Sequence, residues 1–141
     1  MFTYTHAVQY YETDRMGVTH HSNYIRWMEE ARMAMLEEMG FSYQKLESMG
    51  IVSPVTEVDC KYKAPSTFAD VITIHTGIES FNGVVLRMRY DMRKADGTLV
   101  CEGHSEHCFL NGKGFFIRLR RDFPDFFQAL TDRVEPEAAQ G

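Results

Sequence analysis

The chain has few of the features that mark secreted, membrane-bound or disulfide-rich proteins. Its 141 residues include only three cysteines, Cys60, Cys101 and Cys108, an odd number without the CxxC spacing typical of metal sites. No stretch approaches the roughly 20 apolar residues that a membrane-spanning helix needs, and residues 1–10 have neither the basic start nor the long apolar run of a signal peptide. We therefore predict a protein without a membrane span, with free thiols, in the reducing cytoplasm.

An excess of positive charge is also absent, because the formal net charge is −5 at pH 7. This charge argues against a general nucleic-acid-binding protein. Internal repeats, linkers and low-complexity segments are missing as well, so residues 1–141 are predicted to form a single domain whose tail frays from about residue 133. A chain of this length can bury roughly two-thirds of its unfolded surface, and so needs no disulfide or metal to fold.

The polarity pattern predicts a strand followed by a long helix. Residues 2–10 alternate aromatic or apolar side chains with mostly polar ones, as a half-buried strand does. From about residue 23 to residue 39, apolar side chains recur at helical spacing. We expect Asn23 or Ser22 to cap the start of this helix and Gly40 to follow its end.

After a short second helix over residues 42–49, the sequence predicts an antiparallel meander. The turn sequences Asn82-Gly83 and Asp96-Gly97 indicate hairpins, and a short helix is expected from Asp122 or Pro124 to about residue 131. The long helix can bury its apolar side only against the sheet. The fold class is therefore α+β, with an antiparallel sheet wrapped around one long helix as in the hotdog fold. The strands are expected over residues 51–63, 71–78, 84–93 and 98–110.

The segment that precedes the long helix holds the best catalytic candidates. Asp14 lies close to a helix N-terminus, where unpaired N–H groups and the helix dipole favour an anion, so we expect it to be ionised at neutral pH. Gly17 lets the backbone turn and approach a ligand closely. The N–H groups from His20 to Asn23 are placed to polarise a carbonyl oxygen. An aspartate before a helix is often only a cap, but an acid beside a carbonyl site favours acyl transfer or hydrolysis.

The same segment resembles a known family signature. That family, the 4-hydroxybenzoyl-CoA thioesterases with the short acyl-CoA thioesterases associated with Tol-Pal, usually has Tyr-x-Asp-Thr-Asp-x-x-Gly-Val-Val-Tyr-His-x-Asn-Tyr, then a helix with Trp or Phe and Glu-x-Ala-Arg. The resemblance covers about residues 4–131. It also includes Pro65 and Asp70, and the run Arg118-Leu119-Arg120. Its first block in this chain is Glu12-Thr13-Asp14-x-x-Gly17-Val18-x-x-His21-x-Asn23-Tyr24-x-Arg26-Trp27-x-Glu29-x-Ala31-Arg32.

The resemblance implies a hotdog acyl-CoA thioesterase with defined roles for three residues. Asp14 matches the catalytic carboxylate, acting as a nucleophile or by activating water, and Gly17 matches the glycine of the turn. His21 matches the position whose backbone N–H points at the thioester carbonyl, and its side chain can also assist. Coenzyme A would enter as part of the substrate, with no further cofactor. The family's pairing of sheets implies a homodimer or homotetramer with sites between subunits.

Three positions depart from the family pattern. Glu12 replaces the more usual first aspartate, which we expect to matter little because the second acid is the catalytic one. His20 stands where the family often has tyrosine and would alter the pocket wall, and Ala69 replaces a glycine before Asp70. We expect Asp70 to be structural, capping the turn that precedes it.

The acyl group and the phosphates of coenzyme A each have candidate ligands. Tyr24, together with Tyr10, Tyr11 and Phe41, would favour an aryl or medium-chain acid. For the phosphates we favour an arginine group that follows the last strand, because arginine forks suit phosphate. This group is Arg118, Arg120 and Arg121; the competitors are Arg87, Arg89 and Arg93, which share one face of a strand, and Lys61, Lys63 and Lys113.

Two further sets of residues are given structural roles. His104 and His107, three apart on a strand, point to opposite faces and cannot easily share a metal with Cys108. Glu29 on the long helix is expected to pair with Arg26 or Arg32.

Two functions of other classes remain open beside the thioesterase. One is a lyase of the same fold, a hydratase or dehydratase acting on acyl thioesters, which would also use an acid–base pair. The other is a non-catalytic module that binds acyl thioesters or acyl carrier protein. Release of free thiol distinguishes the thioesterase from both.

Overall fold

The computed structural model describes residues 1–135; residues 136–141, which contain most of the tail predicted to fray, lie outside the described part. The described residues form one antiparallel sheet of five strands in the order β1-β3-β4-β5-β2. The strands are β1 (Phe2–Ala7), β2 (Val55–Tyr62), β3 (Val71–Phe81), β4 (Leu86–Arg93) and β5 (Leu99–His107).

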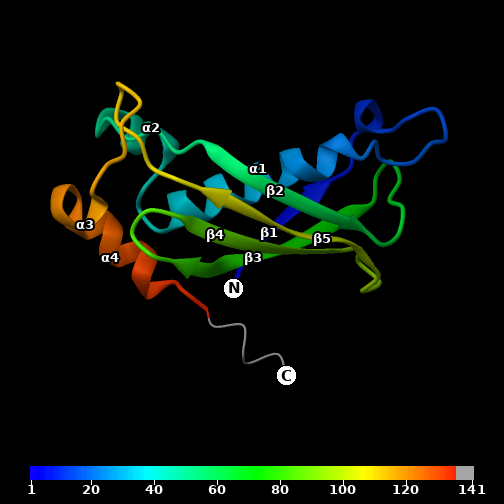
Figure 1. Cartoon of the computed structure of the whole chain (residues 1–141). Helices are drawn as coiled ribbons and strands as arrows, with labels where there is room; N and C mark the ends of the chain where they lie inside the picture. The colour runs from blue at the N-terminus through cyan, green and yellow to red at the C-terminus, as the bar shows by residue number, and fades with distance from the viewer. Residues whose placement is uncertain (136–141) are drawn as a thin grey trace.

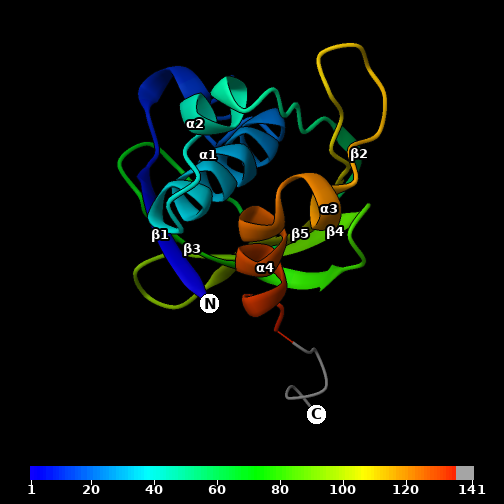
Figure 2. The ribbon, with the colours of Figure 1, turned by 90° about the vertical axis from the view of Figure 1, so that its left-hand side faces the viewer.

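The long helix α1 lies across one face of this sheet, and the sheet curves around it (Figures 1 and 2). Figure 1 shows the segment that precedes α1 at one end of the molecule and α2, α3 and α4 at the other. No helix within residues 1–135 is long and apolar enough to cross a membrane. The helices are η1 (Tyr10–Glu12, a 3-10 turn), α1 (Ser22–Glu38), α2 (Tyr43–Ser48), α3 (Leu119–Asp122) and α4 (Pro124–Asp132).

The core forms between α1 and the inner face of the sheet. Along β4 the predicted alternation is confirmed, because one set of side chains is buried while the arginines between them point outward. The helix contributes its own apolar side, on which Trp27 and Ala31 are fully buried. Each fully buried large side chain stabilises the fold by about 1.5–3 kcal/mol. The predicted arrangement of a sheet wrapped around one helix is therefore confirmed.

Gly103 on β5 marks a place where the backbone leaves no room for a side chain. A Cβ there would run into the backbone oxygen of Asp59 on β2 and would lie 2.8 Å from Cε of Met28 on α1. Real Cβ atoms do not approach other atoms so closely, so a larger residue would force β2 or α1 away from the sheet.

The first predicted strand is shorter than expected. β1 ends at Ala7, and the chain then turns into η1, because the Glu12 carboxylate accepts a hydrogen bond from the Gln9 N–H at 2.8 Å. Tyr10 and Tyr11 consequently face solvent, with 76% and 81% of their surface exposed. Their rings therefore lie on the surface of this chain and not in its core.

Asp70 has the structural role predicted for it, because it stabilises the turn that leads into β3. Its Oδ2 accepts a hydrogen bond from the Thr67 N–H at 2.9 Å. Ala69 beside it has a φ of +73°, the left-handed region that favours glycine. The turn therefore keeps the geometry expected of glycine although alanine replaces it, at a cost of about 1 kcal/mol.

Candidate active site

The segment between η1 and α1 folds back as a small hairpin. A backbone bridge pairs Thr13 with Thr19, and the Asp14 N–H donates to the Val18 carbonyl at 2.8 Å. The Gly17 N–H donates to the Asp14 carbonyl at 3.0 Å, and Gly17 has a φ of +78°. This left-handed conformation is the one that glycine adopts without strain. The closed hairpin holds Asp14 near the residues that lead into α1.

The Asp14 side chain is oriented by its own loop. Its Oδ1 accepts a hydrogen bond from the Met16 N–H at 2.8 Å. The side chain remains partly exposed, so solvent or a ligand can reach it. A carboxylate that is fixed in orientation and accessible can attack a carbonyl carbon or remove a proton from water.

His21 occupies the position directly before α1. Within residues 1–135 its backbone N–H has no hydrogen-bond acceptor. Its carbonyl accepts a hydrogen bond from the Tyr62 hydroxyl at 3.3 Å, which connects the start of α1 to the end of β2. The open N–H at the N-terminus of a 17-residue helix is a suitable donor for a carbonyl oxygen.

The predicted cap of α1 is wrong, because His21 occupies the N-cap position and makes no side-chain capping hydrogen bond. The His20 Nδ1 accepts the Ser22 N–H at 3.2 Å, and its ring stacks on the exposed His21 ring with centroids 4.3 Å apart. Asn23 is buried and uses its amide to donate to the Glu12 carbonyl at 2.9 Å. His20 therefore satisfies a helix N–H. Its place in the wall of a substrate pocket stays a prediction.

Glu12 is the residue whose importance the sequence analysis missed. Its carboxylate is buried and lies 2.8 Å from the Trp27 Nε1 donor, 2.8 Å from His6 Nε2 and 2.8 Å from the Gln9 N–H. Burial alone would raise the pKa of Glu12, but the hydrogen bonds from Gln9, His6 and Trp27 outweigh it and hold the pKa below its usual value. The Glu12 carbonyl also accepts the His20 N–H at 2.8 Å. Glu12 thus connects the hairpin to β1 and α1.

Tyr24 is buried behind the hairpin rather than exposed to a ligand. Its hydroxyl lies 2.9 Å from the Ser66 hydroxyl, which in turn lies 2.6 Å from the Thr19 hydroxyl. Burial raises the pKa of Tyr24, although its hydrogen bonds partly oppose this. Within this chain, Tyr24 supports the hairpin at Thr19, and its predicted contact with substrate stays a prediction.

The model of the thioesterase-like superfamily matches residues 8–130, which include the whole hairpin and the start of α1. The chain belongs to the thioesterase-like superfamily. The resemblance predicted from the Asp14 segment is confirmed.

Relatives of this thioesterase-like chain agree in sequence and in fold. YneP of Bacillus subtilis (strain 168) is 36% identical over 123 residues, covering 86% of this chain and 89% of that protein. The acyl-CoA thioester hydrolase YbgC of Escherichia coli O6:H1 is 32% identical over 102 residues, covering 72% of this chain and 76% of that protein. The solved structure of a DHNA-CoA thioesterase from Staphylococcus aureus has a TM-score of 0.88 at 32% identity, covering 92% of this chain and 88% of that one. The predicted hotdog fold is confirmed by this similarity.

The arginines favoured for the coenzyme A phosphates lie far from Asp14 of the same chain. Arg118 precedes α3, and Arg120 and Arg121 lie within it, at the end of the molecule opposite the hairpin (Figure 1). The two ends are separated by the length of α1, about 25 Å for its residues. Arg121 is moreover paired with Asp122, from Nε to Oδ1 at 2.8 Å. Their predicted role requires a site completed by a second copy of the chain.

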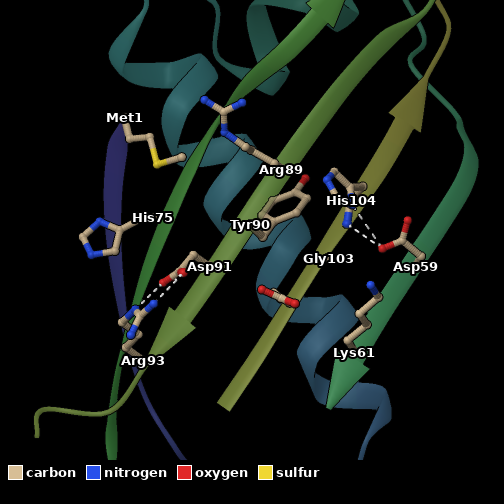
Figure 3. A pocket seen from close by; sticks show the side chains of 11 residues that line it. Met1, Asp59, Lys61, His75, Arg89, Tyr90, Asp91, Arg93, Gly103 and His104 are labelled. Carbon is tan, nitrogen blue, oxygen red and sulfur yellow. Dashed lines mark hydrogen bonds and ion pairs between the residues drawn. The ribbon is translucent and has the colours of Figure 1, made fainter. Parts of the chain in front are cut away.

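The competing arginines on β4 lie on the outer face of the sheet, which forms a shallow pocket of about 520 Å³ lined mostly by charged residues. Figure 3 shows this pocket, where Arg93 points to Asp91. Their Nε–Oδ1 distance is 2.8 Å. Arg87 is paired with Glu79 and Glu106, both at 3.0 Å. These paired side chains support the interpretation of a solvated, ion-paired sheet face.

The predicted opposite directions of His104 and His107 are confirmed. His104 points to the outer face, where its Nδ1 lies 3.3 Å from Asp59 (Figure 3), whereas His107 is buried on the inner face. Within the described part of the chain, no group of three or more histidine, cysteine or acidic side chains could hold a metal ion.

Among residues 1–135, Glu29 forms no ion pair, so its predicted pairing with Arg26 or Arg32 is not found.

Proposed function

We propose that this chain is an acyl-CoA thioesterase that hydrolyses a thioester to a free acid and coenzyme A. The observation that carries the proposal is the pairing of an oriented Asp14 carboxylate with the open N–H of His21 at the start of α1. Among thioesterase-like proteins, the relative YbgC is named as an acyl-CoA thioester hydrolase, which supports the same chemistry here.

In the proposed mechanism, the His21 N–H donates to the thioester oxygen and stabilises the negative charge that develops on it. Asp14 either attacks the carbonyl carbon, expelling the thiolate and leaving an anhydride that water cleaves, or removes a proton from a water that attacks directly. Both routes yield the acid and the thiol, and both need the carboxylate and the N–H together. The bound coenzyme A belongs to the substrate, so no separate cofactor is required.

The test is the release of free thiol from short, medium, long and aryl acyl-CoAs, followed with a thiol-reactive dye. Turnover of any of them by the folded protein would support a thioesterase. Binding of an acyl-CoA without thiol release would instead favour the binding module, and addition of water across an enoyl-CoA would favour the hydratase. Such outcomes would contradict the proposal.

Gly17→Ala provides a test of the hairpin. Alanine at a φ of +78° is strained by about 1 kcal/mol, although no atom lies within 4 Å of the added Cβ. Relief of this strain would shift Asp14, and we expect kcat/KM to fall by about 10-fold or more. The matched control is Gly50→Ala, since Gly50 has the same φ of +78° and equally open surroundings, and it follows α2, which lies at the end of the molecule opposite the Asp14 hairpin (Figure 1). Equal activity losses in both variants would contradict the role of Gly17.

We also propose that a second copy pairs along β2. This strand lies at one edge of the sheet and is exposed along nearly its whole length, including the apolar Val58 and Tyr62. Exposed apolar edge strands are sites of pairing with another chain. Because Tyr62 contacts His21, a partner here would border the active site. The molar mass in solution should be two or four times 16.3 kDa, and a monomeric mass by light scattering would contradict this.

The location in the cytoplasm stays a proposal that rests on the three thiols. Cys60, Cys101 and Cys108 are all free in the structure. Such thiols persist most readily in a reducing compartment.

A further inference from the structure

A small cavity opens between α1 and the inner face of the sheet, away from the Asp14 hairpin but on the same helix. Its volume is about 100 Å³. Ile25 and Met28 of α1 and Val55 and Val58 of β2 form its apolar side. Polar side chains form the rest, and they come from α1, β4 and β5. The polar members are Glu29, Arg32, Tyr90, Ser105 and His107.

Arg32 is the exceptional member of this lining. Only 8% of its surface is exposed, yet within residues 1–135 its guanidinium donates no hydrogen bond and forms no ion pair within 4.0 Å. Burial lowers the pKa of Arg32, and the nearby Tyr90 and Glu29 oppose that shift. Glu29 is exposed, at the mouth of the cavity. No nitrogen of this guanidinium is fully enclosed, so an acceptor that enters the cavity can reach its donors.

The groups opposite Arg32 also have unused hydrogen-bonding capacity. The Tyr90 hydroxyl lies 2.7 Å from the Ser105 hydroxyl, which lies 2.7 Å from His107 Nε2. His107 is 1% exposed, and its Nδ1 has no partner within the described residues. Burial, helped by the positive charge of Arg32, lowers the pKa of His107 to about 3, so the ring is neutral at physiological pH. The cavity therefore ends in one cation and a chain of neutral hydrogen-bonding groups.

The cavity lies further along α1 from His21, beginning at Ile25. Ile25 follows His21 by about one helical turn, and Arg32 follows it by eleven residues, roughly 16 Å along the helix axis. Long side chains on a helix lean back towards its N-terminus, which brings the guanidinium closer to the carbonyl position. An acyl chain that passes Ile25 and Met28 would approach Arg32 with its far end, and a chain of about six carbons comes nearer to the guanidinium than one of four.

We propose that this cavity binds the acyl group and that Arg32 recognises a carboxylate at its far end, making short ω-carboxyacyl-CoAs the preferred substrates. The proposal rests on the thioesterase function proposed above. A carboxylate would accept two parallel hydrogen bonds from the guanidinium, the strongest arrangement open to arginine. The apolar walls would contact the methylene groups between the two ends.

The experiment compares kcat/KM for succinyl-, glutaryl- and adipyl-CoA with straight-chain acyl-CoAs of equal length that end in a methyl or a hydroxyl group. Wild type should prefer the carboxylate end over the methyl end by about 10- to 100-fold, the worth of one charged hydrogen-bonded pair, with the hydroxyl end between them. Arg32→Met should abolish the preference, and Arg26→Met, on the exposed side of the same helix, should leave it unchanged. Glu29→Gln removes a negative charge at the cavity mouth and should increase the preference.

Thermal unfolding separates recognition from a structural role. If Arg32 has no anionic partner until substrate binds, Arg32→Met removes a largely buried charge from the unliganded protein and should raise its Tm. A lower Tm with unchanged selectivity would overturn the proposal, as would a wild-type preference for methyl-ended chains. Calorimetric binding of glutaryl-CoA and pentanoyl-CoA to Asp14→Asn tests recognition without turnover. Equal affinities there would overturn the inference even if hydrolysis is observed, whereas unequal affinities without hydrolysis would overturn only the thioesterase.

Discussion

Asp14→Asn should lower kcat/KM for thiol release by about 1,000-fold or more while leaving the fold intact. Asparagine has nearly the same shape, and its side-chain oxygen can still accept the Met16 N–H that orients Asp14 at 2.8 Å. The amide can neither attack a carbonyl at a useful rate nor take a proton from water. The loss should therefore be almost entirely in the chemical step, with acyl-CoA binding retained.

The measurement is thiol release under saturating and limiting acyl-CoA, together with calorimetric binding and Tm. Asp125→Asn is the matched control, because Asp125 is an exposed aspartate at the start of α4, far from the hairpin. Undiminished turnover in Asp14→Asn would exclude Asp14 as nucleophile or base. A single turnover in ¹⁸O-labelled water distinguishes the two roles of Asp14. Only the anhydride route can transfer an oxygen of Asp14 to the product acid.

Glu12→Gln should cost the protein about 2–4 kcal/mol of stability and also reduce turnover. Three donors converge on the Glu12 carboxylate, from Gln9, His6 and Trp27. A glutamine offers one acceptor oxygen, and its NH₂ group would face another donor, which leaves a buried group unpaired. Because the hairpin is attached through this residue, turnover should fall with stability.

Urea unfolding measures the stability change, and Glu47→Gln on the exposed surface of α2 is the control expected to change stability by less than about 0.5 kcal/mol. A Glu12→Gln variant as stable as that control would show that the buried network contributes nothing.

The pH dependence of the Glu12 effect follows from its lowered pKa. Burial raises the pKa of Glu12, but the hydrogen bonds to its carboxylate lower it by more. Glu12 is therefore protonated at a higher pH in the unfolded chain than in the folded chain. The carboxylate therefore stabilises the fold fully above the ordinary value of 4.5, and this contribution is lost as the pH falls through the folded pKa. The Tm difference between wild type and Glu12→Gln should be largest near neutral pH and should narrow below about pH 4.5. A constant difference would contradict the assignment.

Much of the fold could be predicted because its signals are local. The alternation along β4, the helical spacing of α1 and the turns at Gly83 and Gly97 depend on residues close in sequence. The position of Asp14 before a glycine turn and a helix is local as well. Its family signature was sufficient to predict a thioesterase before any long-range contact was known.

The predicted end of β1 and the predicted cap of α1 were wrong, because residues distant in sequence form hydrogen bonds with the groups involved. β1 was predicted to continue to Tyr10, but Glu12 turns back to bind Gln9 and Trp27, which lies 15 residues further on. Asn23 or Ser22 was predicted to cap α1, but the Glu12 carbonyl accepts a hydrogen bond from the Asn23 amide, and Ser22 is the first residue of the helix. A second acidic residue two positions before Asp14, followed by a tryptophan in the helix, is the sequence signal that could have indicated this network.

The sequence by itself determined the fold class, the family and the two groups proposed to act on the thioester, because each depends on short-range pattern and backbone conformation. Only the tertiary structure decided which side chains share a space. It placed Arg118, Arg120 and Arg121 at the far end of α1 from Asp14, and it left Arg32 buried beside Tyr90 and His107 without an acceptor. Burial and unmatched hydrogen bonds arise from packing between segments remote in sequence, so no local pattern encodes them.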